Sequence, residues 1–462
     1  MKPHLSLLTL CLLLGACGST AQRPDSGIQP PSSWQSPHTQ NATHRNLQWW
    51  TQFGSPELDR LIEQARVGSY DLAAAIARVR QAQADTVIAG GSLLPEVKAG
   101  LNANRQKLLR GSGYSQLDAD SSNKAVDYFD ANLSATYEID FWGGQRASRD
   151  SAQFGLQASE FDRATVELTL LSGVANSYAQ ALSLREQSRI AELNLANAQN
   201  VLNLVQTRFD SGSATALELA QQKSLVAAQQ RQLPLVQQQA QDALISLAAL
   251  LGRPVQQLRL GAERFDQLSW PTIAAGVPSE LLTRRPDIAR AEAQLAAAQA
   301  DVTVARAAML PAVTLSAELG SGADRAADIL RNPFYNLTAG LLAPVFNNGR
   351  LSAERDKATA RQEELLENYR GAIINGFADV EKALNGIRGL DEQRQWQVEE
   401  LNQAQTAFNI AQSRYEAGAE DLLTVLETQR TLYAAQDLNV QLRLSRLQAS
   451  IALYKALGGG WQ

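Results

Sequence analysis

Residues Phe129–Phe141 read FDANLSATYEIDF. Every odd-numbered position in this stretch is apolar and every even-numbered position is polar, over thirteen residues. Because successive side chains of a β-strand point to opposite faces, this alternation predicts a strand with one apolar and one polar face. A second segment, 97–103, alternates more weakly and is its expected partner. Together they predict a strand pair at about 95–141.

This strand pair belongs to the first copy of an internal duplication. Four landmarks recur in the same order along the chain, at an offset of 216 for the first and 205 or 206 for the others. They are Leu94-Pro95 with Leu310-Pro311, Phe141 and Gly144 with Phe346 and Gly349, Arg208 and Gly212 with Arg414 and Gly418, and Leu251-Gly252 with Leu457-Gly458. The drop in offset indicates a longer loop in the first copy. The second copy predicts another pair of alternating strands at about 311–346.

A very long helix is expected after each strand pair. No proline occurs from Gln145 to Phe209 or from Arg350 to Tyr415. About 65 residues at roughly 1.5 Å each give about 95 Å of helix. The apolar positions in these segments recur in steps of three and four, which is the 3.5-residue period of a coiled coil. Each long helix is expected to end at a glycine turn, near residue 212 or 418, and to return as a shorter helix.

The N-terminus predicts export and lipid attachment. A lysine and the apolar run 5–14 match the core of a signal peptide, and the run is too short to span a bilayer as a helix. The run ends in Leu14-Gly15-Ala16-Cys17, which resembles the site at which bacterial lipoproteins are cut and acylated. We expect Cys17 to carry S-diacylglycerol and an N-acyl chain such as palmitate, and Gly18 after it favours the outer membrane. The alternative is a chance thiol behind an ordinary signal peptide.

The composition excludes several classes of protein. Removing the signal peptide takes Lys2 with it, so the mature charge is 41 − 47 = −6, which argues against binding to nucleic acid. The three histidines, at positions 4, 38 and 44, leave no cluster for a metal or a general base. The mature chain keeps no free thiol once Cys17 is acylated, and it contains no run of eighteen apolar residues. We expect no enzyme activity, no metal and no cofactor besides the covalent lipid.

The four predicted strands cannot form a stable sheet within a single chain. Their apolar faces need lipid or a core, and unpaired strand edges are not tolerated in a bilayer. Four strands are also too few to enclose a lumen, since about eight only just accommodate their side chains. Closure therefore requires several copies of the chain, with the polar positions of 130–138 lining the lumen. The strand count does not decide the number of copies.

Four motifs identify a family that the chain resembles. They are Trp49 to Phe53 with Pro56-Glu57-Leu58, Tyr137 to Gly143, Leu281 to Ile288, and Arg414 to Gly418. In this order, within a duplicated chain, they resemble the TolC/OprM-type outer-membrane efflux factors of the OprM/NodT-like lipoprotein branch. The resemblance implies a mostly α fold with β, in which each protomer of a homotrimer supplies two β-hairpins and long coiled-coil helices. It also implies a trimeric twelve-stranded β-barrel continued by a twelve-helix α-barrel.

The expected domain organisation follows from the repeat and the resemblance. In chain order it comprises a signal peptide at 1–16, a lipidated arm at 17–57, a first repeat at 58–252, a connecting segment at 253–285, a second repeat at 286–458 and a tail at 459–462. We expect Trp49 and Trp50 of the arm to pack internally. The string Arg284-Arg285-Pro286-Asp287 is expected to be structural, because proline and aspartate suit the start of a helix.

The resemblance also assigns roles at the two hairpin tips. Carried over by position, the residues that narrow the periplasmic end of OprM fall on Leu423 and Glu427, which are four apart and share a helix face. In a trimer they imply a leucine plug and a carboxylate ring that disfavours anions. The residues expected to meet a periplasmic adaptor protein are Arg208, Gly212, Arg414, Tyr415 and Gly418. The alternative is that Glu427 is an ordinary solvated acid.

The implied function is passive export. The chain has no nucleotide-binding loop, so the energy must come from an inner-membrane transporter, for this branch most often of the proton-driven resistance–nodulation–division class. We expect an exit channel in the outer membrane of a Gram-negative bacterium for drugs, toxic compounds, metals or siderophores, with a role in antibiotic resistance. One alternative is an outlet for ATP-driven type I protein secretion. The other is a periplasmic coiled-coil lipoprotein that forms no channel.

Overall fold

The computed structural model describes residues 25–36, 48–107, 126–271 and 273–459. The predicted lipid site, Cys17, lies outside them. The chain divides into two compact units that each draw on three stretches of sequence. Unit 1 comprises 1–28, 80–158 and 291–370, and unit 2 comprises 29–79, 159–290 and 371–462.

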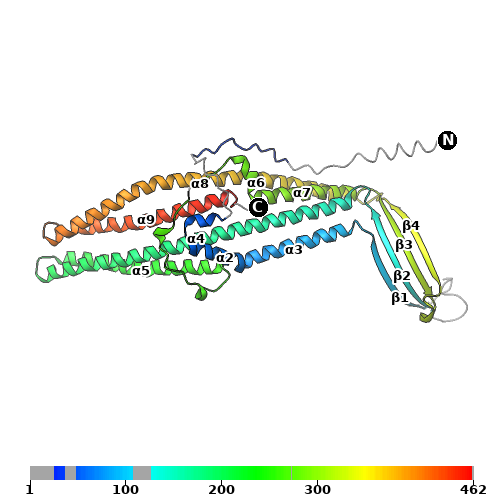
Figure 1. The fold of residues 1–462 in the computed structure, drawn as a ribbon, viewed down its shortest axis with the longest axis horizontal. Helices are drawn as coiled ribbons and strands as arrows, with labels where there is room; N and C mark the ends of the chain where they lie inside the picture. The colour runs from blue at the N-terminus through cyan, green and yellow to red at the C-terminus, as the bar shows by residue number, and fades with distance from the viewer. Residues whose placement is uncertain (1–24, 37–47, 108–125, 272, 460–462) are drawn as a thin grey trace. The chain divides into compact units, whose positions relative to one another are not determined.

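Most of the chain is helical (Figure 1). The longer helices are α2 (Pro56–Gly68), α3 (Tyr70–Gly91), α4 (Gly144–Asp210), α5 (Ala216–Leu250), α7 (Pro286–Ala307), α8 (Arg350–Glu416) and α9 (Leu422–Ala456). The short helical turns are η1 (Trp49–Phe53), η2 (Val255–Gln257), η3 (Phe265–Gln267), η4 (Pro278–Glu280), α6 (Leu281–Arg284) and η5 (Ala326–Asp328). The 67 residues of α4 and of α8 confirm the prediction of two very long helices. Among the residues described, no helix is long and apolar enough to cross a membrane.

Unit 1 contains one antiparallel sheet. Its strands are β1 (Glu96–Gln106), β2 (Val126–Ile139), β3 (Ala312–Ala323) and β4 (Pro333–Leu342), and they lie in this order across the sheet (Figure 1). The pairs β1–β2 and β3–β4 are the two predicted β-hairpins. Strand β2 also pairs with β3, which sets Leu133 opposite Leu319. The two repeats are therefore joined edge to edge in a single sheet.

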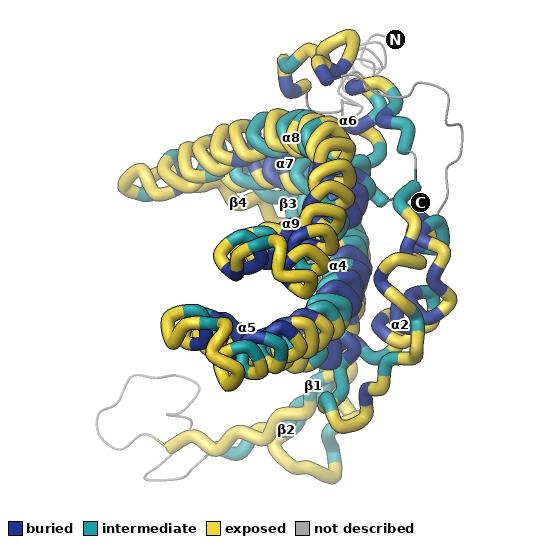
Figure 2. The backbone as a smooth tube through the Cα atoms, turned by 90° about the vertical axis from the view of Figure 1, so that its left-hand side faces the viewer, coloured by how far each residue is buried: buried dark blue, intermediate teal, exposed yellow. Residues whose placement is uncertain are grey.

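The two faces of this sheet differ in polarity, as the alternation predicted. On the polar face, the Asn102 side-chain amide donates to Asp130 at 2.8 Å and that of Asn132 donates to Glu318 at 3.2 Å. On the other face, leucines of all four strands are between 41% and 80% exposed, and Figure 2 shows β1 and β2 mainly as exposed or intermediate. These leucines are Leu101, Leu133, Leu315, Leu319, Leu337 and Leu341. Within the described part of one chain, the sheet thus lacks a core of its own.

A continuous apolar core holds unit 2 together. Side chains of η1, α2, α4, α5 and α9 meet in it, together with side chains of the segment that follows α5. Trp49 and Trp50 are 1% and 4% exposed, and the Trp49 ring stacks on that of Tyr454 with centroids 5.2 Å apart. Their burial confirms that the tryptophans of the arm pack internally.

Arg285 joins the start of α7 to α8 and α9 within unit 2. Its guanidinium donates to both carboxylate oxygens of Asp287, at 3.0 and 2.7 Å, to Asp379 at 3.1 Å and to the carbonyl of Ala456 at 3.1 Å. Burial alone would raise the pKa of Asp287, but the hydrogen bonds and charge of Arg285 outweigh it and lower that pKa. These contacts give the predicted structural role of this string a physical basis.

Candidate functional site

The first part of the candidate site is the turn between α4 and α5. Gly212 adopts a left-handed φ of +75°, a conformation that glycine takes without a steric penalty. The carbonyl of Arg208 accepts from the N–H of Ser213 at 2.8 Å and closes the turn. Thr215 then caps α5 in a capping box with Glu218, in which each side chain accepts from the backbone N–H of the other.

The turn between α8 and α9 has the same geometry. Gly418 has a φ of +76°, and the carbonyl of Arg414 accepts from the N–H of Ala419 at 2.8 Å. Asp421 caps α9, because its carboxylate accepts from the N–H of Thr424 at 2.8 Å, and this hydrogen bond lowers the pKa of Asp421. Both glycine turns lie where the internal repeat predicted them.

Arg208 links the two tips. Its Nη2 donates to the carbonyl of Tyr415 at 2.5 Å and to that of Glu416 at 3.4 Å, and its guanidinium lies 4.2 Å from the centroid of the Tyr415 ring. Tyr415 is 2% exposed. Burial raises the pKa of its hydroxyl, although the charge of Arg208 opposes the rise. Arg208 therefore ties the first hairpin to the second at the tips.

Behind this link, the hairpins share an apolar core to which α4, α5, α8 and α9 all contribute. Its members include Val201, Val205, Leu219, Leu225, Phe408, Leu422, Val425 and Leu426. Buried amides hold each hairpin together: Gln222 donates to a carbonyl of α4, and Gln397 donates to a carbonyl of α9, both at 2.8 Å. Between the hairpins, Tyr433 donates to the carbonyl of Asn194 at 2.9 Å, and burial raises the pKa of Tyr433 to about 12. Separating the tips therefore breaks contacts between hairpins without breaking those within a hairpin.

The predicted constriction residues lie on the first turns of α9. Leu423 is 62% exposed and Glu427 is also exposed, whereas their neighbours Leu422 and Leu426 are buried. The spacing of four residues puts the leucine and the acid on one face, one helical turn apart. In a single chain this face is free to contact other copies of the chain.

The sequence reasoning missed an equivalent leucine on the first hairpin. Leu217 is the second residue of α5 and is 67% exposed. The repeat offset could have found it, because 423 − 206 = 217, and the same offset places Gln221 where the second hairpin has Glu427. Both tips therefore present an exposed leucine, but only the second pairs it with an acid.

The remaining predicted tip residues differ in exposure. Arg414 is exposed and forms an ion pair with Glu420 at 3.2 Å, and both glycines of the turns are exposed. Tyr415 is buried, so a protein that meets the tips can act on it only through residues such as Arg208. The tip surface thus includes two exposed glycine turns and the exposed Arg414.

The N-terminal arm is fastened at two places. In unit 1, Arg370 Nε donates to the carbonyl of Ser26 at 2.8 Å. In unit 2, Trp34 is 5% exposed, and the carboxylate of Glu381 accepts from the N–H groups of the two residues after Trp34, at 2.6 and 3.2 Å. A carboxylate that accepts from consecutive backbone N–H groups holds the backbone as well as the side chains of the arm.

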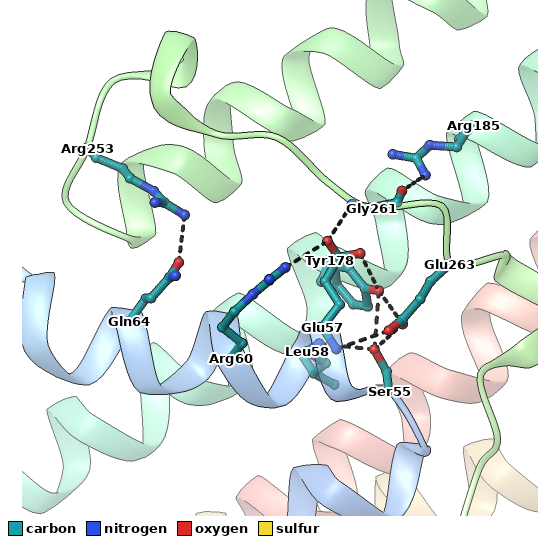
Figure 3. Close-up of polar contacts among 10 residues, drawn as sticks. All are labelled: Ser55, Glu57, Leu58, Arg60, Gln64, Tyr178, Arg185, Arg253, Gly261 and Glu263. Atoms are coloured by element: carbon teal, nitrogen blue, oxygen red, sulfur yellow. Dashed lines mark hydrogen bonds and ion pairs between the residues drawn. The ribbon is translucent and has the colours of Figure 1, made fainter.

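A buried polar cluster follows the arm at the start of α2 (Figure 3). Tyr178 of α4 lies between two acids, with its hydroxyl 3.1 Å from Glu57 Oε2 and 2.8 Å from Glu263 Oε2. The Ser55 hydroxyl donates to Glu263, and the backbone N–H of Glu57 donates to it at 3.0 Å. Burial alone would raise the pKa of Glu263, but these hydrogen bonds outweigh it and lower that pKa. The cluster joins α2, α4 and the segment after α5 through a charged acceptor.

Comparison with protein-family models matches residues 61–253 and 277–459 to the outer membrane efflux protein family. Two curated relatives are named pyoverdine export outer membrane protein OpmQ. That of Pseudomonas aeruginosa is 66% identical over 460 residues, covering 99% of this chain and 97% of its own length. That of Pseudomonas putida is 63% identical over 460 residues, covering 99% of this chain and 98% of its own.

Solved structures of outer-membrane channels are similar over almost the whole chain. The outer-membrane channel OprN superposes with a TM-score of 0.87 at 26% identity, over 96% of this chain and 99% of that one. CusC, whose structures are described in terms of transmembrane channel formation, superposes with a TM-score of 0.82 at 28% identity, over 94% of this chain and 99% of that one.

Proposed function

This chain belongs to the outer membrane efflux protein family, and we propose that it forms the exit channel through which an inner-membrane pump expels small molecules. Its membership confirms the resemblance inferred from the sequence. The likeness to OprN and CusC confirms the mostly helical fold built on two β-hairpins. The chain is an outer-membrane efflux protein, in a family of channels and not of enzymes.

The proposed cargo is pyoverdine or a closely similar compound. The observation that carries this proposal is the 66% identity, over nearly the full length, with the pyoverdine export protein of Pseudomonas aeruginosa. Relatives at 30% and 28% identity are named for the efflux of toluene and of cations. These names favour small molecules over the type I secretion of whole proteins.

The test is to express this chain in a Pseudomonas aeruginosa strain that lacks OpmQ. Pyoverdine is measured in the medium and in cell extracts by mass spectrometry, with the endogenous OpmQ gene and an empty vector as controls. We expect the chain to move pyoverdine from the extract to the medium. Unchanged retention of pyoverdine, in cells whose outer membrane contains the chain, would defeat this choice of cargo.

We propose that the working form is a trimer. The support is the sheet of unit 1, which leaves one edge of β1 and one edge of β4 unpaired and its leucines exposed within the described part of one chain. Both the edges and the apolar face require cover. Three copies would supply twelve strands, with polar side chains such as Asn132 inside and the leucines against lipid. Light scattering on the detergent-purified protein tests the number, and a monodisperse monomer or dimer would contradict it.

The proposed gate is at the hairpin tips. The exposed pair Leu423 and Glu427 would face its copies and narrow the channel, and the Arg208 link would have to break when the hairpins separate. A periplasmic adaptor that meets the exposed glycine turns would supply the energy for this separation. We propose a transporter of the resistance–nodulation–division class as the source of cargo, and co-purification with an adaptor tests that assembly.

We propose that Cys17 carries the lipid anchor. The support is a match of lengths within unit 1, where Arg370 of α8 binds the carbonyl of Ser26. Nine residues from Cys17 to Ser26 reach at most about 30 Å. The twenty residues of α8 between 350 and 370 rise by about 30 Å, and α8 begins next to Phe346, which is 85% exposed. The number of residues between Cys17 and Ser26 is therefore large enough for the acyl chains to reach the level of the apolar end of the strands.

A further inference from the structure

Trp270 stands in the segment between α5 and α6, and three arginines gather around its ring. The guanidinium carbons of Arg394, Arg443 and Arg446 lie 4.0, 4.8 and 6.0 Å from the ring centroid. The arginines come from α8 and α9, and all four residues belong to unit 2. Each distance lies within the range of a cation–π contact, and the indole is the strongest aromatic partner for a cation.

Two of these arginines are held in place by the protein itself. Arg446, with a side chain 8% exposed, donates to Asp391 at 2.7 Å and to the Ser450 hydroxyl at 2.6 Å. Arg443 donates from one nitrogen to the carbonyls of residues 266 and 268, at 2.7 and 2.8 Å. Because their partners fix them, these two guanidiniums form a rigid cationic base beside the indole.

Arg394 is held much more loosely. Its ion pair with Asp391 has an N–O distance of 3.7 Å, too long for a good hydrogen bond, and its side chain is 26% exposed. Its guanidinium carbon lies over the Trp270 ring, 4.0 Å from the centroid. Its fork of donors is therefore available to an acceptor that arrives from solution.

The cluster carries more positive than negative charge. Asp391 is the carboxylate that pairs with Arg394 and Arg446. The nearby Asp266 is paired with Arg264 at 2.6 Å. Burial lowers the pKa of Arg394 and that of Arg443, and the neighbouring arginines lower both further. An additional carboxylate beside these guanidiniums would relieve their repulsion.

We propose that this cluster, Trp270 with Arg394, Arg443 and Arg446, is a docking site for an acidic segment of a protein partner. A carboxylate of the partner binds Arg394 and lies beside the carboxylate of Asp391 in the cluster. The site is separate from the hairpin tips, and it does not depend on the cargo of the channel.

The geometry favours an acidic protein segment over a free anion. The ion pairs of Asp391 show that a side-chain carboxylate fits against Arg394 and Arg446. Asp391 is itself 45% exposed, so the cluster is open to solvent on this side. A free anion at such a surface is screened by salt and held weakly. A carboxylate that belongs to a folded partner gains from the other contacts of that partner, and an arginine fork suits it geometrically.

Calorimetric titration of the full-length protein in detergent, with a hexaglutamate peptide as the probe, tests the proposal. Arg394→Gln should weaken binding about tenfold, the effect of losing one charged hydrogen bond. The matched control is Arg388→Gln, an exposed arginine on the same helix that donates to Asn385 at 2.8 Å. This control should change binding less than about twofold. Hexaglutamate, and not hexaglutamine, should change the tryptophan fluorescence, and Trp270→Phe should abolish this change because the other tryptophans lie outside the cluster.

Two further measurements separate docking from simple packing. If the guanidinium of Arg394 only stabilised the fold, Arg394→Gln would lower Tm by several degrees, whereas relief of repulsion leaves Tm unchanged or higher. A clear loss of Tm would overturn the proposal. So would the absence of hexaglutamate binding to the wild type, an equal effect of the Arg388 and Arg394 variants, or inorganic sulfate that binds as tightly as the peptide.

Discussion

We expect the strength of the contact between Arg208 and Tyr415 to determine how readily the tips separate. Replacing Arg208 with glutamine removes a charged donor from the carbonyl of Tyr415 and a cation that lies 4.2 Å from its ring. A hydrogen bond to a charged group contributes about 1.5–3 kcal/mol. A partly exposed cation–π contact adds about 0.5–1 kcal/mol. Because Arg208 is partly exposed, we take a total of about 2 kcal/mol per chain.

This free energy sets the size of the expected effect. About 2 kcal/mol corresponds to roughly a thirtyfold shift in the equilibrium between joined and separated tips. The shift appears as open probability only if the link must break for the channel to open. Arg208→Lys should have a smaller effect, because lysine can still donate to the carbonyl but lacks the planar group that stacks on tyrosine.

Single-channel recording in planar bilayers measures the open probability directly. The matched control is Arg231→Gln, an exposed arginine on α5 of the same hairpin. We expect Arg208→Gln to open far more often than the wild type, and Arg231→Gln to behave like the wild type. If the Arg208 and Arg231 variants open equally rarely, the Arg208 link does not hold the tips closed and the reasoning is refuted.

Three further predictions concern other parts of the chain. Replacing both Leu423 and Glu427 with glycine should raise single-channel conductance, because it removes the side chains that narrow the periplasmic end of the channel. An unchanged conductance would place the constriction elsewhere. The lowered pKa of Glu263 means that its carboxylate stabilises the fold at neutral pH and that this contribution is lost as the pH falls below about 4. When the pH is lowered from 7 to below about 4, the Tm of Glu263→Gln should therefore fall less than the Tm of the wild type, as followed by circular dichroism. An equal fall of Tm in both proteins would argue against this role. Cys17→Ser should abolish labelling by radioactive palmitate, and persistent labelling would exclude this cysteine as the acylated residue.

Much of the fold could be predicted because it is written in local patterns. The alternation of Phe129–Phe141 encodes a two-faced strand, since side-chain direction in a strand depends only on position along it. The duplication then placed the second strand pair. The glycine turns at Gly212 and Gly418 could be predicted in the same way, because a turn that requires a left-handed φ favours glycine.

The candidate site was only partly predictable. The positions of Leu423 and Glu427 came from resemblance, and the structure adds that both are exposed. Leu217 was within reach of the repeat offset but carries no signal of its own, since an exposed leucine on a helix is common. Tyr415 was expected at the surface of the tip and is instead buried beneath Arg208.

The strands, the lengths of the helices and the turns could all be predicted from the order of the residues, because each depends on residues a few positions apart. The contacts that hold these parts together became visible once the chain was folded. Arg208 meets a carbonyl 207 residues away, Arg285 meets one 171 residues away, and Trp270 meets arginines more than a hundred residues on. An arginine in an amphipathic helix looks the same in sequence whether it faces water, an aromatic ring or a distant carbonyl. The physical reason is that its partner is set by how the helices pack, which no local period encodes.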